Sequence, residues 1–281
     1  MAITPARDEE RLLPGLIASM EAQNVRPDRW ILIDDGSADR TLSIAQEAAA
    51  RCSWIEVHHL DRRADRAPGG ESVVMRFLPC DQRADYDFIL RLDADLTFGP
   101  QMAELLIAEF DKNPRLGIAG AVLYEPSGSG WREIRMPRFH TRGAAKMYST
   151  KCFDAIGGLQ AGIGWDTIDG AQAMMLGFEP RNFRHIVAYH HRPQGAAGGI
   201  LRGRFGTGRT AYVLGYSPIF MVARAAANAL QSPPIIGSIM LLAGYVEGYF
   251  RRLPRSASPE LVKFIRRQQL RRLLMLESTW Q

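Results

Sequence analysis

Two aspartates one residue apart, Asp93 and Asp95, are the residues of this chain whose spacing most clearly suggests chemistry. They follow the apolar run Phe88-Ile89-Leu90. Side chains two apart in a strand point to the same side, so both carboxylates can offer oxygens to one hard divalent cation, which also accepts phosphate oxygens. We interpret a similar pair, Asp85 and Asp87, as the solvated entry to the same strand. The first pair predicts a metal site at the carboxyl end of a strand, where ligands bind in open α/β sheets.

Two earlier strand ends are also polar and acidic. The first strand runs into Thr4-Pro5-Ala6-Arg7-Asp8-Glu9-Glu10, and the second into Asp34-Asp35-Gly36-Ser37-Ala38-Asp39-Arg40-Thr41. Each turn taken alone is typical of an ordinary strand-to-helix connection. Together with Asp93-Ala94-Asp95 they predict three acidic strand ends that converge on one edge of a sheet.

The elements that must position these residues follow from the alternation of apolar runs and amphipathic segments, which predicts an α/β fold with a mostly parallel sheet. We expect a charged loop at residues 61–69 and a flexible break at residues 125–130. We expect strands at 1–4, 30–33, 54–57, 87–92, 116–124 and 183–190, and helices at 9–23, 39–51, 71–78, 100–112, 151–156 and 166–176.

Length and composition suit one large domain, or one domain with an appendage. The chain has 281 residues, of which 46% are hydrophobic, so it can bury a sizeable core. Its three cysteines are widely spaced, which favours a reducing compartment and shows no zinc or disulfide framework. We expect a catalytic domain at 1–195 and a C-terminal region at 196–281.

Most of the net charge of +5 comes from the tail, because residues 251–281 hold eight Arg or Lys and two Glu. The apolar segments 211–230 and 233–250 precede this tail, and neither is a convincing membrane span. We expect them to lie in a membrane interface, with Tyr212, Tyr216, Tyr245 and Tyr249 at headgroup depth. The alternative is that both pack as ordinary core helices. A membrane surface is favoured over nucleic acid because no nucleic-acid-binding motif accompanies the charge.

The order and spacing of the three acidic turns resemble the family 2 glycosyltransferases, over roughly residues 1–195. Asp8 departs from the pattern, since the family usually has Asn there. The resemblance implies a GT-A fold, a Rossmann-like mostly parallel sheet flanked by helices, here followed by a helical membrane-associating region. It also implies inverting transfer of a sugar from a UDP-, GDP- or dTDP-sugar to an acceptor hydroxyl. With the interfacial helices, it suggests a lipid-linked saccharide acceptor at the cytoplasmic face of a membrane, in polysaccharide biosynthesis.

The resemblance also assigns roles around the nucleotide sugar. Asp34 or Asp35 would accept a hydrogen bond from a ring N–H of the base. Asp95, with Asp93, would hold Mg²⁺ or Mn²⁺ and the ribose. The pocket for the base and ribose would be lined by Pro5, Ala6, Arg7 and Glu9.

The catalytic base of the family corresponds to Asp166, which stands eleven residues before Gly177 near the start of a helix. Trp165 replaces the Glu that usually precedes this residue. Two alternatives remain open: Asp166 as a simple helix N-cap, and Asp169 as the base.

Two later segments are further candidates. In some GT-A enzymes a late histidine completes the metal shell, so His190 or His191 could do so here, with His191 as the first choice. The segment 198–209 combines glycines with Arg202, Arg204 and Arg209, which predicts a mobile lid over a diphosphate. Its alternative is a solvated basic linker.

Two other functions compete with sugar transfer. A sugar-phosphate nucleotidyltransferase would need a glycine-rich loop after the first strand to hold a triphosphate, and Thr4-Pro5-Ala6-Arg7 has none. A non-catalytic membrane-bound component of a polysaccharide assembly complex would not need Asp93, Asp95 and Asp166 together.

Overall fold

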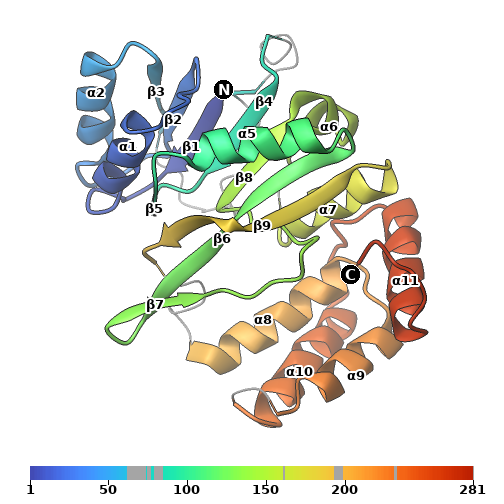
Figure 1. Cartoon of the computed structure of the whole chain (residues 1–281). Coiled ribbons are helices and arrows are strands. Elements are labelled where there is room, and N and C mark those ends of the chain that lie inside the picture. Colours follow the sequence, from blue (N-terminus) through green and yellow to red (C-terminus); the bar gives the residue numbers. More distant parts are fainter. Residues whose placement is uncertain are drawn as a thin grey trace.

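The computed structural model describes residues 1–61, 74, 77–78, 85–160, 162–192, 199–230 and 233–280. Most of the predicted loop 61–69 and of the predicted helix 71–78 lies outside these residues. Over the described part, strands and helices build one layered α/β body with a group of helices at its C-terminal end (Figure 1).

The described strands form one sheet in the order β3-β2-β1-β4-β8-β6-β9-β5, with β7 paired to β6. β1 to β4 pair in parallel, but β8 is antiparallel to both its neighbours, so the sheet is mixed rather than mostly parallel. The reason is that β6, β7 and β8 follow one another without a helix, and strands joined without a crossover reverse direction. The bounds are β1 Ala2–Ala6, β2 Trp30–Asp34, β3 Ile55–His59, β4 Phe88–Leu92, β5 Leu96–Phe98, β6 Leu116–Ser127, β7 Gly130–Glu133, β8 Ala145–Ser149 and β9 Glu179–His190.

Helices cover both faces of the sheet, which explains why its central strands are apolar on both sides over most of their length. Side chains alternate between faces, so Ala2 and Leu32 pack with α1, α2 and α5, while Ile3 and Ile31 pack with α6 and part of α7. The helix bounds are α1 Leu13–Glu21, α2 Thr41–Arg51, α5 Met102–Lys112, α6 Thr150–Ala155 and α7 Trp165–Met175.

The C-terminal third folds into four helices with their own apolar core. The predicted headgroup positions of three tyrosines are wrong, because Tyr212, Tyr216 and Tyr245 are buried in this core. Their rings contact other aromatic rings, and the Tyr245 hydroxyl donates to the Tyr216 carbonyl. The helices are α8 Gly199–Val213, α9 Pro218–Ala227, α10 Ile236–Phe250 and α11 Pro259–Leu273.

The glycine- and arginine-rich segment predicted as a mobile lid is the helix α8. Its glycines allow close packing: a Cβ at Gly208 would stand 2.0 Å from the carbonyl oxygen of Leu241 in α10. A Cβ at Gly244 of α10 would likewise stand 2.0 Å from the carbonyl oxygen of Phe205 in α8. The physical cause of the error is that glycine serves backbone contact as well as backbone flexibility. Among the described helices, none combines the length and the apolarity needed to cross a membrane.

Candidate active site

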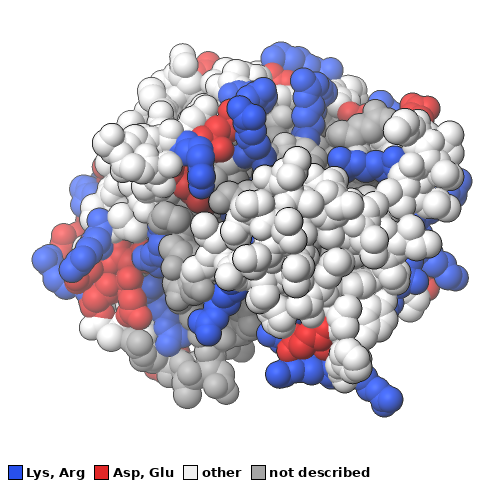
Figure 2. Space-filling view, turned by 90° about the horizontal axis from the view of Figure 1, so that it is seen from below, with Lys and Arg blue, Asp and Glu red and all other residues white. Residues whose placement is uncertain are grey.

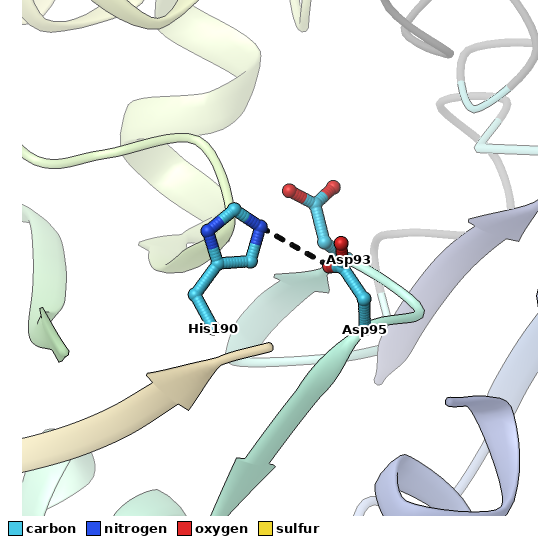
Figure 3. A group of neighbouring side chains, drawn as sticks. All are labelled: Asp93, Asp95 and His190. Atoms are coloured by element: carbon cyan, nitrogen blue, oxygen red, sulfur yellow. Dashed lines mark ion pairs between the residues drawn. The ribbon is translucent and has the colours of Figure 1, made fainter. Parts of the chain in front are cut away.

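Asp93, Asp95 and His190 form the centre of the candidate site (Figure 3). Each offers one ligand atom, and these atoms all lie within 4.8 Å of one another. The His190 Nε2 is 3.2 Å from an Asp95 oxygen. Two carboxylates and an imidazole suit a divalent cation, so these residues fit the metal that the sequence predicts.

Backbone pairing holds this group in place. Asp93 and Asp95 lie between β4 and β5, and the Asp93 N–H donates to the Ala144 carbonyl. His190 is the last residue of β9 and pairs with Leu96 of β5, which brings it beside Asp95. Its second ring nitrogen lies 3.4 Å from Glu125.

The charge around His190 is negative. Burial disfavours its protonated form, but hydrogen bonding to Asp95 and the nearby carboxylates of Asp93 and Glu125 outweigh burial and raise its pKa above the ordinary value. The carboxylates around His190 therefore favour a cation, whether a proton or a metal ion.

His191, the first choice from the sequence, lies elsewhere. Successive side chains of a strand alternate between faces, and the His191 ring bonds to the Thr97 hydroxyl at 2.8 Å. The same ring packs edge-on against Trp131. The structure therefore replaces His191 with His190 as the candidate metal ligand.

The two acidic turns at the start of the chain are bonded to each other. Asp8 has a positive φ of 55°, which Asp tolerates better than most residues, and its N–H donates to the Ser37 hydroxyl. The Asp8 carboxylate accepts from the Ala38 N–H, and the Glu9 N–H donates to the Thr41 hydroxyl. These bonds hold Pro5, Ala6 and Arg7 beside the end of β2.

Asp34 and Asp35, which the sequence left as alternatives, differ in their surroundings. The buried Asp34 carboxylate bonds to His59 at 2.7 Å and accepts from the Ser37 N–H. Asp35 forms an ion pair with Arg7 at 3.8 Å, and its side chain retains 16% exposure. Asp34 thus stabilises the turn, which makes Asp35 the better candidate for contact with a base.

One ion pair joins the first turn to the end of β9. Arg192 donates to the buried Glu9 at 2.6 Å, across 183 positions of sequence. Arg192 and Glu9 also line a surface pocket together with Asp8 and Asp39. The Glu9 carboxylate therefore positions the segment that follows His190, rather than only lining a nucleotide pocket.

Asp166 lies in the first turn of α7, with its side chain 30% exposed and 3.9 Å from His140 Nε2. It is not the N-cap, because Gly164 occupies that position in a left-handed conformation. The Lys146 ammonium donates to the backbone carbonyl of Asp166 at 2.8 Å. This bond fixes the backbone and does not involve the Asp166 carboxylate. This geometry suits a carboxylate that accepts a proton.

Asp169, the alternative base, is buried and already bonded. Lys146 donates to both its oxygens, at 2.8 and 2.9 Å, and Tyr148 donates to one of them. Burial raises the pKa of Asp169, against the opposing effect of Lys146. Breaking such a buried pair is costly, so its role is to hold α7 on the sheet.

Trp165, which replaces the usual Glu, connects the two halves of the site. Its ring faces the Arg91 guanidinium at 5.0 Å and the Lys146 ammonium at 5.2 Å. Arg91 in turn forms an ion pair with Asp93. A continuous path of contacts therefore leads from the carboxylates at the metal position to the start of α7 and Asp166.

The arginines of α8 are distributed differently from the prediction. Arg209 forms an ion pair with Glu247 of α10 at 3.0 Å, and Arg204 lies beside Gly237 at the start of α10. Arg202 is exposed on α8. Two of the three arginines thus lie against α10. Among the contacts that the structure describes, none joins these arginines to Asp93, Asp95 or His190.

The sequence reasoning missed four residues of the site: Arg91, His140, Lys146 and Trp165 as an aromatic bridge. Arg91 and Lys146 each stand inside an apolar strand. A basic residue in such a strand needs a buried acidic or aromatic partner, and this was the available signal. His140 lies in irregular backbone, where no sequence pattern indicated it.

Acid should destabilise the fold through His140. Burial lowers the pKa of His140 to about 4, although the Asp166 carboxylate opposes this. In the unfolded chain His140 binds a proton with the ordinary pKa of 6.5. Its contribution to the free energy of unfolding is therefore fully present above pH 6.5 and is lost as the pH falls from 6.5 toward 4. We expect His140→Gln to reduce this acid-induced loss by about 1–2 kcal/mol, measured by urea unfolding at several pH values. His185→Gln, at an exposed histidine, is the control, and an equal effect of both variants would contradict the assignment.

Comparison with known proteins agrees with this geometry. A sequence model described as "Glycosyl transferase family 2" matches residues 1–163. One curated relative, a 4,4'-diaponeurosporenoate glycosyltransferase of Staphylococcus haemolyticus, is 29% identical over 44% of this chain and 32% of its own length. A second, an undecaprenyl-phosphate 4-deoxy-4-formamido-L-arabinose transferase of Pectobacterium carotovorum, is 35% identical over 37% of this chain and 31% of its own. The chain thus spans about a third of each relative.

A solved structure shares the fold over most of the chain. The mannosyltransferase PcManGT from Pyrobaculum calidifontis, in complex with GDP-Man and Mn²⁺, has a TM-score of 0.57 and 13% identity. The match covers 94% of this chain and 77% of the other. At this identity the similarity establishes the fold alone, a GT-A-like mixed sheet flanked by helices.

Proposed function

Because the chain belongs to glycosyl transferase family 2, we propose that it transfers a sugar from a nucleotide-sugar donor to an acceptor hydroxyl. The observation that carries this proposal is the group of Asp93, Asp95 and His190. This group lies at the same sheet edge as the two turns that are bonded to each other through Asp8 and Ser37. Arg192, which follows His190 closely, connects the group to the first of these turns through its ion pair with Glu9.

Asp93, Asp95 and His190 would hold Mg²⁺ or Mn²⁺, and the structure with GDP-Man and Mn²⁺ supports this choice for the shared fold. A divalent cation supplies positive charge against the diphosphate that leaves as the sugar is transferred. Arg7 and Asp35, at the ends of β1 and β2, are the candidates for contact with the base and ribose.

Asp166 is the proposed general base. Its carboxylate would take the proton of the acceptor hydroxyl as that oxygen bonds to the anomeric carbon and the bond from this carbon to the diphosphate breaks. A single displacement of this kind inverts the configuration. Lys146 and Trp165 contribute by fixing the first turn of α7, so that the carboxylate keeps its position.

We further propose a lipid-linked saccharide acceptor at the cytoplasmic face of a membrane, in polysaccharide biosynthesis. The relative named for undecaprenyl phosphate supports a lipid-linked acceptor. The acceptor would approach the side of the site where α7 meets α8, since Gly164 lies against Thr210 of α8 and Leu214, which follows it.

A thermal-shift panel of UDP, GDP and dTDP with and without Mn²⁺ tests the donor site. Ligand binding to the folded state raises the melting temperature by mass action, so the correct nucleoside diphosphate should stabilise the protein more when Mn²⁺ is present. Stabilisation by none of the three, with or without the metal, would contradict a nucleotide-sugar site.

A further inference from the structure

An exposed apolar surface covers the outer side of α9 and α10. α10 is apolar around most of its circumference, and spacings of three and four residues separate its exposed side chains, so they form one stripe along the helix. In α9 the same spacing exposes Ile219, at 73%, and Val222, at 60%. We call this surface the outer apolar face; it consists of Ile219, Val222 and Ala226 of α9 and Ile236, Ile239, Ala243, Val246 and Phe250 of α10.

The outer apolar face lies at the end of the molecule remote from β3 and α2 (Figure 1). Figure 2 looks at this end from below and shows a broad expanse without charged residues, with Lys and Arg and fewer Asp and Glu at its margins. Single exposed hydrophobic residues are common on proteins, but a continuous apolar expanse indicates a surface that something covers.

The inner side of α10 packs in a manner typical of helices in lipid. Gly208 of α8 and Gly244 of α10 bring the two backbones into direct contact, and Gly248 packs on the Tyr212 ring. Helix pairs in membranes associate through small residues, because burial of large apolar side chains gives no advantage when lipid surrounds them. α10 thus buries three glycines together with Leu241 and Tyr245, and it exposes a second row of apolar side chains on its outer side, where a water-soluble helix usually carries polar residues.

The charge around the outer apolar face indicates which kind of partner can cover it. Residues 199–255 contain seven arginines and a single acidic residue, Glu247. Glu247 is itself paired with Arg209 at 3.0 Å and with Arg251 at 2.6 Å. A second copy of this chain would bring like charge against like charge, whereas an anionic lipid surface is complementary to it.

We propose that the outer apolar face docks on an anionic membrane, with α9 and α10 lying in the plane of the interface and the surrounding arginines contacting lipid headgroups. α10 has 15 residues, too few to span the hydrocarbon core but enough for a helix of about 22 Å in the interface. This inference does not rest on the proposed reaction. α8 lies between α10 and the start of α7, so docking would place Asp166 one helix away from the lipid.

Vesicle flotation tests the proposal without any donor or acceptor. The probes are vesicles of phosphatidylcholine alone and vesicles of phosphatidylcholine with an equal amount of phosphatidylglycerol. We expect the protein to float with the anionic vesicles, and the double variant Ile239→Glu/Val246→Glu to bind them at least about tenfold more weakly. Both positions are exposed, so the variant should keep its fold, which circular dichroism and an unchanged melting temperature would verify.

Val25→Glu is the matched control, since Val25 is an exposed valine in the turn between α1 and β2. Loss of binding in the double variant alone, with stronger binding to anionic than to neutral vesicles, supports the proposal. Unchanged binding by the double variant, or an equal loss with Val25→Glu, overturns it. A dimer in light scattering that the double variant abolishes, without vesicle binding by either form, would also overturn it in favour of a second copy.

Discussion

Asp95→Asn should reduce sugar transfer by at least about a thousandfold while leaving the fold intact. The substitution keeps the size of the side chain but removes the charge that faces Asp93 and His190. A neutral amide binds a divalent cation poorly, so the variant should also lose the Mn²⁺-dependent part of its stabilisation by nucleoside diphosphate. Steady-state transfer and thermal shift on the same preparation measure both effects.

Asp87→Asn is the control for this prediction, because Asp87 belongs to the similar pair at the start of β4 and is exposed. It should transfer sugar at the rate of the unmodified protein. Full turnover by Asp95→Asn would remove Asp95 from the metal position. Equal losses in both variants would mean that the assay responds to any loss of a carboxylate rather than to one site.

Asp166→Asn should lower kcat by about a thousandfold and leave donor affinity unchanged. The variant retains the backbone carbonyl at position 166 that accepts from Lys146, so α7 should stay in place. What the variant lacks is a group basic enough to take the hydroxyl proton. Donor affinity measured by calorimetry, next to kcat, separates this effect from the one at Asp95, where binding and turnover should fall together.

Asp111→Asn, at an exposed position of α5, is the matched control for Asp166→Asn. Turnover should be unchanged in this variant. If Asp166→Asn kept its full kcat, the general base would have to be another group, and the contacts of Asp169 with Lys146 and Tyr148 would need to open for it to serve.

The sequence predicted the sheet edge correctly because the order of apolar runs and acidic turns is a local property. The choice between His190 and His191 could not be made in the same way. A shift of one residue in a strand exchanges its two faces, and only the pairing of His190 with Leu96 decides which imidazole meets Asp95. Strand register depends on contacts across the sheet, which no single segment records.

The C-terminal region shows a second limit. The glycines of α8 predicted flexibility, but Gly208 is buried against the backbone of α10. The tyrosines predicted an interface with headgroups, but Tyr212 and Tyr245 pack against each other inside. Both errors have one cause: residue type indicates what a side chain can do, and the partner that decides its role lies on another helix.

The ion pair between Glu9 and Arg192 has a consequence for the order in which the protein folds. It connects residues near the two ends of the sheet-forming segment. Closing so long a loop costs conformational entropy and is therefore slow, so we expect this contact to be among the last to form. The surface pocket that Glu9 and Arg192 line would then be completed only after the whole sheet has assembled. A fragment ending at residue 163, the last residue that the family model matches, would lack Asp166, His190 and Arg192, so we expect it not to bind a nucleoside diphosphate.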